Sequence, residues 1–202
     1  PSGGPFSRDH GSILDRSGRV HVEGNRAIYD AAEAYARKSA AGRSQFDSIS
    51  ALTGRAEPTV VIVSEIGFIS WFDPRKNTIY WSPNTSISYK GQGGRPGNEG
   101  TWDASPALVL LHEVAHAVGF HNNPNNYGKA NEPDGTPYDN PEEKRVITGV
   151  ETPAAKQLGE PTRTTHGGTP NTEPAPVVPA TEPRKRKTPC GGAQEPCNRR
   201  TP

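Results

Sequence analysis

The residues best placed to do chemistry in this sequence are His112, Glu113 and His116, which form the pattern His-Glu-x-x-His. In a helix, side chains four positions apart lie on one face, so both imidazoles can reach the same zinc ion. Glu113 is then within reach of a water on that metal. The pattern therefore predicts zinc-assisted hydrolysis with Glu113 as the general base.

The segment 105–119 has to present these three side chains, and its composition predicts a buried helix. Ser105 is a good N-cap, Pro106 fits the first helical position, and Gly119 is placed to end the helix. The other sides are apolar and consist of Leu108, Leu110, Leu111, Val114, Ala115 and Val118. A coincidental polar pocket is the alternative, but burying two histidines and a glutamate costs several kcal/mol unless a partner such as a metal compensates.

A catalytic zinc usually has three protein ligands and one water, so a third ligand is needed. A third histidine six residues after His116 is excluded because position 122 is Asn, and the chain has no Met for the methionine turn of that class. The candidates that remain are His121, Asp134, Asp139, Glu142, Glu143, Glu151 and His166. Glu142 and Glu143 would also complement the dipole of their helix by ~0.3–1 kcal/mol each without a metal. Spacing alone does not choose among the glutamates.

The composition predicts one folded domain with unstructured ends. Only 31% of the 202 residues are hydrophobic, and the chain has 22 Gly and 21 Pro, which suits a core of about 150 residues or fewer. We assign residues 1–18 to a flexible leader, 19–168 to the folded domain and 169–202 to a disordered, Pro-rich basic tail. Cys190 and Cys197 lie in that tail, either as a disulfide or as two free thiols.

Hydrophobic periodicity predicts an α+β fold in which a small mixed sheet packs on the His-Glu-x-x-His helix. Strands are expected at 19–23, 59–63, 67–72 and 77–82, the last two as a hairpin across the turn 73–76. Helices are expected at 25–43, 140–149 and 152–159. The Gly-rich segment 90–100 predicts a mobile loop, and 122–140 predicts a long irregular connection.

Three motifs follow one another along the chain: His112-Glu113-x-x-His116, Glu142-Glu143 with Gly149 after it, and Arg163-x-x-His166. In this order they resemble the catalytic core of clostridial-neurotoxin-type zinc endopeptidases. They are more similar still to the short effector and toxin zinc metallopeptidases that bacteria deliver into host or rival cells. The segments from Phe72 to Pro83 and from Glu151 to Arg163 also look similar to the effector group. The resemblance covers roughly residues 20–168 and implies a zincin-like metallopeptidase domain.

The resemblance also implies roles for individual residues. His112, His116 and Glu143 would bind one Zn²⁺ per chain, and Arg163 with His166 would stabilise the transition state. The family usually has Tyr at the position of His166; a histidine can also donate a hydrogen bond, but its protonation varies near neutral pH. Surface roles are the alternatives for Arg163 and His166. Glu142 or Glu151 is expected to accept a hydrogen bond from the ring nitrogen of a ligand histidine that does not bind the metal.

We therefore expect a zinc-dependent endopeptidase, secreted or delivered as an effector or toxin, that cleaves a protein of a host or rival cell. The strand 77–82 is expected to pair with an extended substrate. The alternative is a non-catalytic, metal-stabilised interaction domain, which has no need of Glu113.

Other partners receive little support from the sequence. No apolar run reaches the ~20 residues that span a bilayer, so we expect no membrane partner. The net charge of +1 neither favours nor excludes a polyanionic partner. The basic run Arg184–Lys187 is interpreted as a solvated run or a nuclear address, because no aromatic residue lies beyond Tyr138 to stack on nucleic acid. We expect a monomer.

Overall fold

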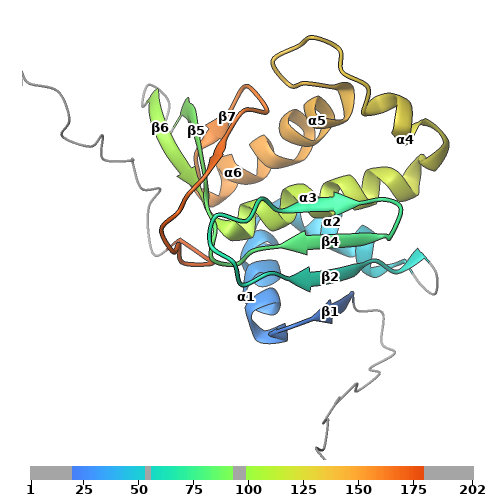
Figure 1. Cartoon of the computed structure of the whole chain (residues 1–202), viewed down its shortest axis with the longest axis horizontal. Coiled ribbons are helices and arrows are strands. Elements are labelled where there is room, and N and C mark those ends of the chain that lie inside the picture. The colour runs from blue at the N-terminus through green and yellow to red at the C-terminus, as the bar shows by residue number, and fades with distance from the viewer. Residues whose placement is uncertain (1–19, 53–55, 93–98, 180–202) are drawn as a thin grey trace, which may run out of the picture.

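The computed structural model describes residues 20–52, 56–92 and 99–179 (Figure 1). Within these residues the fold is α+β, as predicted, with two small sheets and helices packed against them. The expected leader 1–18, the basic run Arg184–Lys187 and both cysteines, Cys190 and Cys197, lie outside the described residues.

The first sheet has four strands in the order β1-β2-β4-β3. β1 (His21–Glu23), β2 (Thr59–Ile62) and β4 (Thr78–Trp81) are parallel, and β3 (Trp71–Asp73) is antiparallel to β4. The β3–β4 pair confirms the predicted hairpin, and the sheet is mixed, as expected. β2 is paired on both sides, with β1 and β4, and Val60 is its one fully buried residue.

The His-Glu-x-x-His helix is α3 (Pro106–Asn122), which lies between the first sheet and the helices α5 and α6 (Figure 1). The Oγ of Ser105 accepts a hydrogen bond from the Leu108 N–H at 3.1 Å, so the predicted cap is confirmed. The indole N–H of the buried Trp81 donates to the Pro106 carbonyl at 2.8 Å and joins β4 to the start of α3. The sheet therefore packs on this helix as predicted.

Gly119 does not end α3, which continues to Asn122, so that prediction is wrong. Gly119 is not among the described glycines with positive φ. A Cβ at this position would lie 2.8 Å from Glu142 Oε1 and would also collide with the Arg145 side chain. The glycine therefore leaves room for these two side chains beside α3.

The predicted helix 25–43 is in fact two helices, α1 (Arg26–Ala36) and α2 (Ala40–Ser50). The break occurs at Ser39, whose Oγ accepts a hydrogen bond from the Gly42 N–H at 2.9 Å and starts α2. A Cβ at Gly42 would overlap the Ala36 carbonyl oxygen. Gly42 therefore allows close packing at the start of a helix rather than a stop.

The second sheet is built on β5 (Ile87–Gln92), which pairs with β6 (Glu99–Ala104), β7 (Thr162–Arg163) and β8 (Thr169–Pro170), all antiparallel. The prediction of a mobile loop is wrong for residues 90–92 and 99–100, which form ladder pairs. Gly91 lies close to the Thr162 backbone, where a side chain would not fit. Gly91 therefore serves a close contact between strands.

The predicted end of the domain at Gly168 is also wrong, because ordered structure continues to residue 179. Besides β8, the amide side chain of Asn171 donates to Ser86 Oγ at 2.6 Å, and Val177 O accepts from the Ala107 N–H at 3.1 Å. These long-range contacts satisfy the polar groups of a segment that proline keeps from forming a longer strand.

The connection after α3 was expected to be irregular, but it contains the short helix α4 (Pro124–Ala130).

A continuous helical segment comes next along the chain. It consists of α5 (Pro141–Val146), a π-helical turn η2 (Ile147–Glu151) and α6 (Thr152–Leu158). Two separate helices were predicted, but the junction residues stay right-handed helical, and the wider turn adjoins Pro153, which has no N–H to donate. Gly159, with a φ of 71°, ends the segment as predicted.

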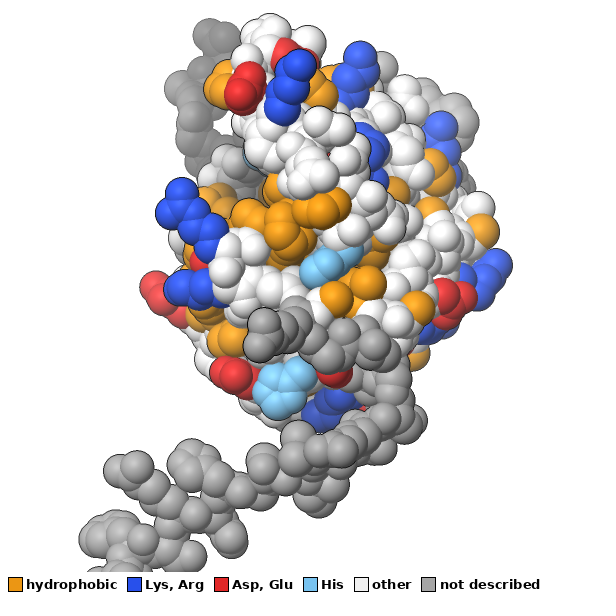
Figure 2. Space-filling view, turned by 90° about the vertical axis from the view of Figure 1, so that its right-hand side faces the viewer, with side chains coloured by type: hydrophobic (Ala, Val, Ile, Leu, Met, Phe, Trp, Pro, Cys, Tyr) orange, Lys and Arg blue, Asp and Glu red, His pale blue; other side chains and the backbone are white. Residues whose placement is uncertain are grey.

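The surface carries charges of both signs. On the face seen in Figure 2, Lys and Arg side chains are scattered among Asp and Glu, and hydrophobic side chains gather near the centre. Among the described helices, none has both the length and the apolar character needed to cross a bilayer.

Candidate metal centre

Two helical segments bring His112, His116 and Glu143 together. His112 and His116 lie one turn apart on α3, and their Nε2 atoms are 3.0 Å apart. Glu143 lies in the first turn of α5, where Asn140 Oδ1 accepts its backbone N–H at 2.8 Å. Its two oxygens lie 3.2 Å from His112 Nε2 and 3.3 Å from His116 Nε2. The three side chains thus surround one point with their basic atoms.

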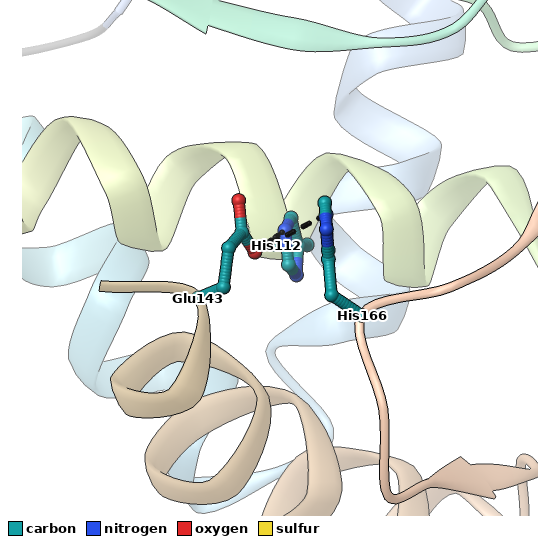
Figure 3. A group of neighbouring side chains, drawn as sticks. All are labelled: His112, Glu143 and His166. Carbon is teal, nitrogen blue, oxygen red and sulfur yellow. Dashed lines mark ion pairs between the residues drawn. The ribbon is translucent and has the colours of Figure 1, made fainter. Parts of the chain in front are cut away.

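His166 adds a fourth basic atom to this group. Its Nε2 lies 3.4 Å from Glu143 Oε2, and its ring is nearly parallel to that of His112, with 12° between the planes. Figure 3 shows His112 on α3, Glu143 on α5 and His166 on the loop after β7 (Thr162–Arg163) pointing toward one another. Their ligand atoms all lie within 4.8 Å of one another, so this group could hold a metal ion.

Each histidine of α3 has its other ring nitrogen next to a carboxylate. His112 Nδ1 lies 2.8 Å from Glu151 Oε2, and His116 Nδ1 lies 3.2 Å from Glu142 Oε1. A carboxylate only accepts hydrogen bonds, so each Nδ1 donates its proton. In the neutral rings both Nε2 atoms then carry lone pairs, as metal ligation requires. Sequence reasoning expected Glu142 or Glu151 in this position, and the structure places both there.

The two carboxylates are held by arginines. Arg163 donates from Nε and Nη2 to the two oxygens of Glu151, at 2.8 and 2.6 Å. Arg145 binds Glu142 in the same way, at 2.8 and 2.6 Å, and also donates to the Ala115 carbonyl on α3 at 2.8 Å. Burial raises the pKa of Glu151, but Arg163 and His112 outweigh it and lower that pKa to about 2. Glu151 is therefore ionised near neutral pH.

The carboxylates around the centre raise its affinity for positive charge. Glu143 Oε2 is buried and accepts no hydrogen bond of good geometry. Burial lowers the pKa of His116, but its bonds with Glu142 and Glu143 raise it overall to about 10. Burial raises the pKa of Glu143, but His112 and His116 lower it overall to well below its ordinary range. Both directions indicate a site that favours positive charge at its centre, whether a proton or a metal ion.

Glu113 lies beside this centre at a cavity of about 350 Å³. Glu113 is buried, with 7% of the residue exposed. The cavity also reaches His112, and its remaining wall is largely apolar, including Ile69, Ile87, Tyr89, Leu108 and Val109. A molecule in the cavity would therefore meet both the carboxylate of Glu113 and the centre.

Arg163 lies next to the Nδ1 side of His112. All three of its guanidinium nitrogens are engaged, because Nη1 donates to the His166 carbonyl at 2.9 Å in addition to the two bonds with Glu151. Arg163 also borders the cavity. Its hydrogen bonds support a role in fixing the site, and direct contact with a transition state stays a prediction.

The strand expected to receive a substrate is not available for pairing. β4 has neighbours on both sides, β2 and β3, so its hydrogen-bonding edges are used. Among the described strands, β3 forms the edge of the first sheet nearest α3 (Figure 1). Ile69 and Ser70, just before β3, line the cavity.

Two other candidate ligands lie elsewhere. His121 Nε2 is 2.8 Å from Asn77 Oδ1, and Asp134 accepts hydrogen bonds from Thr136 within its own turn. Sequence reasoning missed Arg145 and the space left by Gly119. The only local signal for Arg145 is its position three residues after Glu142, on the same face of a helix.

Comparison of the chain with protein-family models, with curated proteins and with solved structures gave no match. The resemblance to effector and toxin metallopeptidases therefore stays a prediction, and the functional argument depends on the geometry of the centre.

Proposed function

We propose that this chain is a zinc-dependent endopeptidase with a zincin-like fold. The observation that carries the proposal is the convergence of His112 Nε2, His116 Nε2 and the Glu143 carboxylate at 3.0–3.3 Å. A tetrahedral zinc with bonds of about 2.0–2.1 Å separates its ligand atoms by about 3.3 Å. These three side chains would therefore hold the ion without a large movement. Three ligands with histidine and carboxylate donors are typical of catalytic zinc.

The chemistry of such a site is divided between the ion and the protein. Zinc, when bound, supplies a Lewis acid that polarises a carbonyl and lowers the pKa of a water to about 7. Glu113 accepts the proton of the attacking water and later donates it to the leaving amine. Glu142 and Glu151 hold the Nδ1 protons of His116 and His112 and so keep both Nε2 atoms directed at the centre.

His166 and Arg163 are proposed to assist at the reacting carbonyl. His166 Nε2 lies 3.4 Å from Glu143 Oε2, and His166 lines the cavity. A protonated His166 could donate a hydrogen bond to the developing oxyanion, and loss of one such donor typically costs ~3 kcal/mol. Arg163 supports this position through its bond with the His166 carbonyl.

The shape of the site supports an extended peptide as the substrate. β3 offers a strand edge next to the cavity, and an extended peptide can add to such an edge through its backbone. The apolar wall of the cavity suits an aliphatic or aromatic side chain beside the cleaved bond. From the sequence resemblance alone, we propose that this peptide belongs to a protein of a host or rival cell, reached by secretion or delivery.

Replacement of Glu113 by Gln tests the proposal. The variant should keep about one equivalent of zinc, because its ligands are intact, and should lose cleavage of a protein mixture from host cells by about 10²-fold or more. Glu132→Gln, a change of the same kind on the exposed loop after α4, should cleave normally. Undiminished cleavage by Glu113→Gln would refute the assigned role.

A second candidate function is a non-catalytic, metal-stabilised interaction domain. His166 favours it, because a nitrogen 3.4 Å from Glu143 Oε2 could close the metal site as a fourth protein ligand. Cobalt substitution separates the two functions. A peptide hydroxamate should change the visible spectrum of the cobalt protein if a coordination position is open, and an unchanged spectrum would favour the structural role.

A further inference from the structure

Every polar atom of His166 except Nε2 is engaged by the protein. Its backbone N–H donates to the Pro137 carbonyl at 2.9 Å, and its carbonyl accepts from Arg163 Nη1 at 2.9 Å. Its Nδ1 lies 2.6 Å from Asp139 Oδ2. The atom left over is Nε2, which faces Glu143.

We propose that Asp139 is a positioning residue for His166. Asp139 holds the Nδ1 proton, so Nε2 is the nitrogen presented to the candidate metal centre. This assignment holds for both protonation states of the ring, because a neutral ring keeps its proton on Nδ1 and a protonated ring carries one on each nitrogen. This role extends the proposed function. The effect expected on kcat rests on that function.

The turn that carries Asp139 is itself fixed. The Asp139 N–H donates to the Thr136 carbonyl at 3.0 Å, and the Asp139 carbonyl accepts from the Asp134 N–H at 3.0 Å. Asp139 has a φ of 69°, a left-handed conformation that Asp and Asn adopt more readily than most residues. The next residue, Asn140, caps the helix that carries Glu143. The same turn therefore fixes the ring of His166, through Asp139, and the start of the helix that carries Glu143, through Asn140.

The pair contributes little to the stability of the fold. The side chains of His166 and Asp139 are 36% and 65% exposed, and an ion pair that accessible to water is weak. Asp139 can therefore be changed without unfolding the protein. Gly and Asn both tolerate the left-handed backbone, so Asp139→Gly removes the contact and Asp139→Asn keeps an oxygen that can accept the proton.

The first test does not need activity. In ¹⁵N-labelled protein, measured without metal and with zinc, the His166 ring nitrogens should show a protonated Nδ1 in the unchanged chain and in Asp139→Asn. In Asp139→Gly this preference should be lost. Glu132→Gln, which removes a charge from the same loop, should leave the signals unchanged. Identical His166 signals in Asp139→Gly and the unchanged chain would overturn the proposal.

The second test is kinetic. Asp139→Gly should lower kcat about 10- to 100-fold with little change in KM, and Asp139→Asn should retain most of the activity. In a His166→Ala background, Asp139→Gly should cost nothing further, because its effect passes through His166. An equal loss in both backgrounds would contradict the proposal. If the unchanged chain cleaves no peptide, the peptidase proposal fails, and the nitrogen signals still decide the role of Asp139.

Discussion

Arg163 and His112 share the carboxylate of Glu151. Arg163 Nη2 and His112 Nδ1 lie 2.6 and 2.8 Å from the same atom, Glu151 Oε2. The orientation of one candidate ligand thus depends on a residue that lies 51 positions further along the chain.

This relationship predicts that Arg163→Lys weakens metal binding. A lysine keeps the charge but cannot bind both Glu151 oxygens with a planar fork. Metal affinity should fall about 10- to 100-fold in a titration against a competing chelator. Arg75→Lys, on the hairpin turn, should bind metal normally. Unchanged affinity together with a large loss of kcat would instead favour direct contact between Arg163 and the transition state.

Gly119→Ala should weaken metal binding although alanine favours helices. The new Cβ would lie 2.8 Å from Glu142 Oε1 and would displace the carboxylate that holds His116. We expect an affinity loss of about tenfold or more. Gly128→Ala is the matched control in α4, because its Cβ would meet nothing within 4 Å and should only stabilise the helix. Equal metal affinity in the two variants would contradict the role of Glu142.

The metal-free protein should lose stability as the pH rises from about 6.5 to 10. The folded-state pKa of His116 is raised from 6.5 to about 10 because the bonds with Glu142 and Glu143 outweigh burial. The stabilisation is therefore fully present below pH 6.5 and is lost as pH rises through the folded-state value. Urea unfolding in the presence of a chelator measures this loss, and His116→Gln should flatten the profile. If the free energy of unfolding of His116→Gln fell with pH as steeply as that of the unchanged chain, the assignment to His116 would be contradicted.

Ile69→Ser should impair cleavage without affecting stability. Ile69 lines the cavity and is 62% exposed, so its removal leaves no buried void. We expect kcat/KM for a peptide with a large apolar side chain at the cleaved bond to fall about tenfold, with an unchanged melting temperature. Ile66→Ser is the control, because Ile66 is 43% exposed and is not part of the cavity wall. Equal effects of the two changes would argue against the cavity as the peptide site.

The local parts of the fold could be predicted from the sequence. The start of α3 depends on Ser105 and Pro106, the start of α5 on Asn140 and Pro141, and the end of α6 on Gly159; each signal lies within a few residues of its effect. The convergence of His112 and His116 follows from helical spacing alone.

The parts that were missed depend on distant contacts. From the sequence alone, Gly91 is typical of a loop and Gly119 of a helix end. In the fold, the Thr162 backbone lies against Gly91, and the side chains of Glu142 and Arg145 occupy the space beside Gly119. Asp139 and His166 are 27 positions apart, and no periodicity connects them. Local propensity cannot report such pairs, because tertiary packing decides them.

The centre lies between two helical segments, with His112 and His116 on α3 and Glu142, Glu143 and Glu151 on the segment from α5 to α6. A metal ion bound there would link the two segments, since its ligands would come from both, and it would stabilise their docked arrangement. Removal of the ion should let the segment from α5 to α6 separate transiently from α3, and chymotrypsin should then cut the folded chain first after Tyr138, in the connection 131–140.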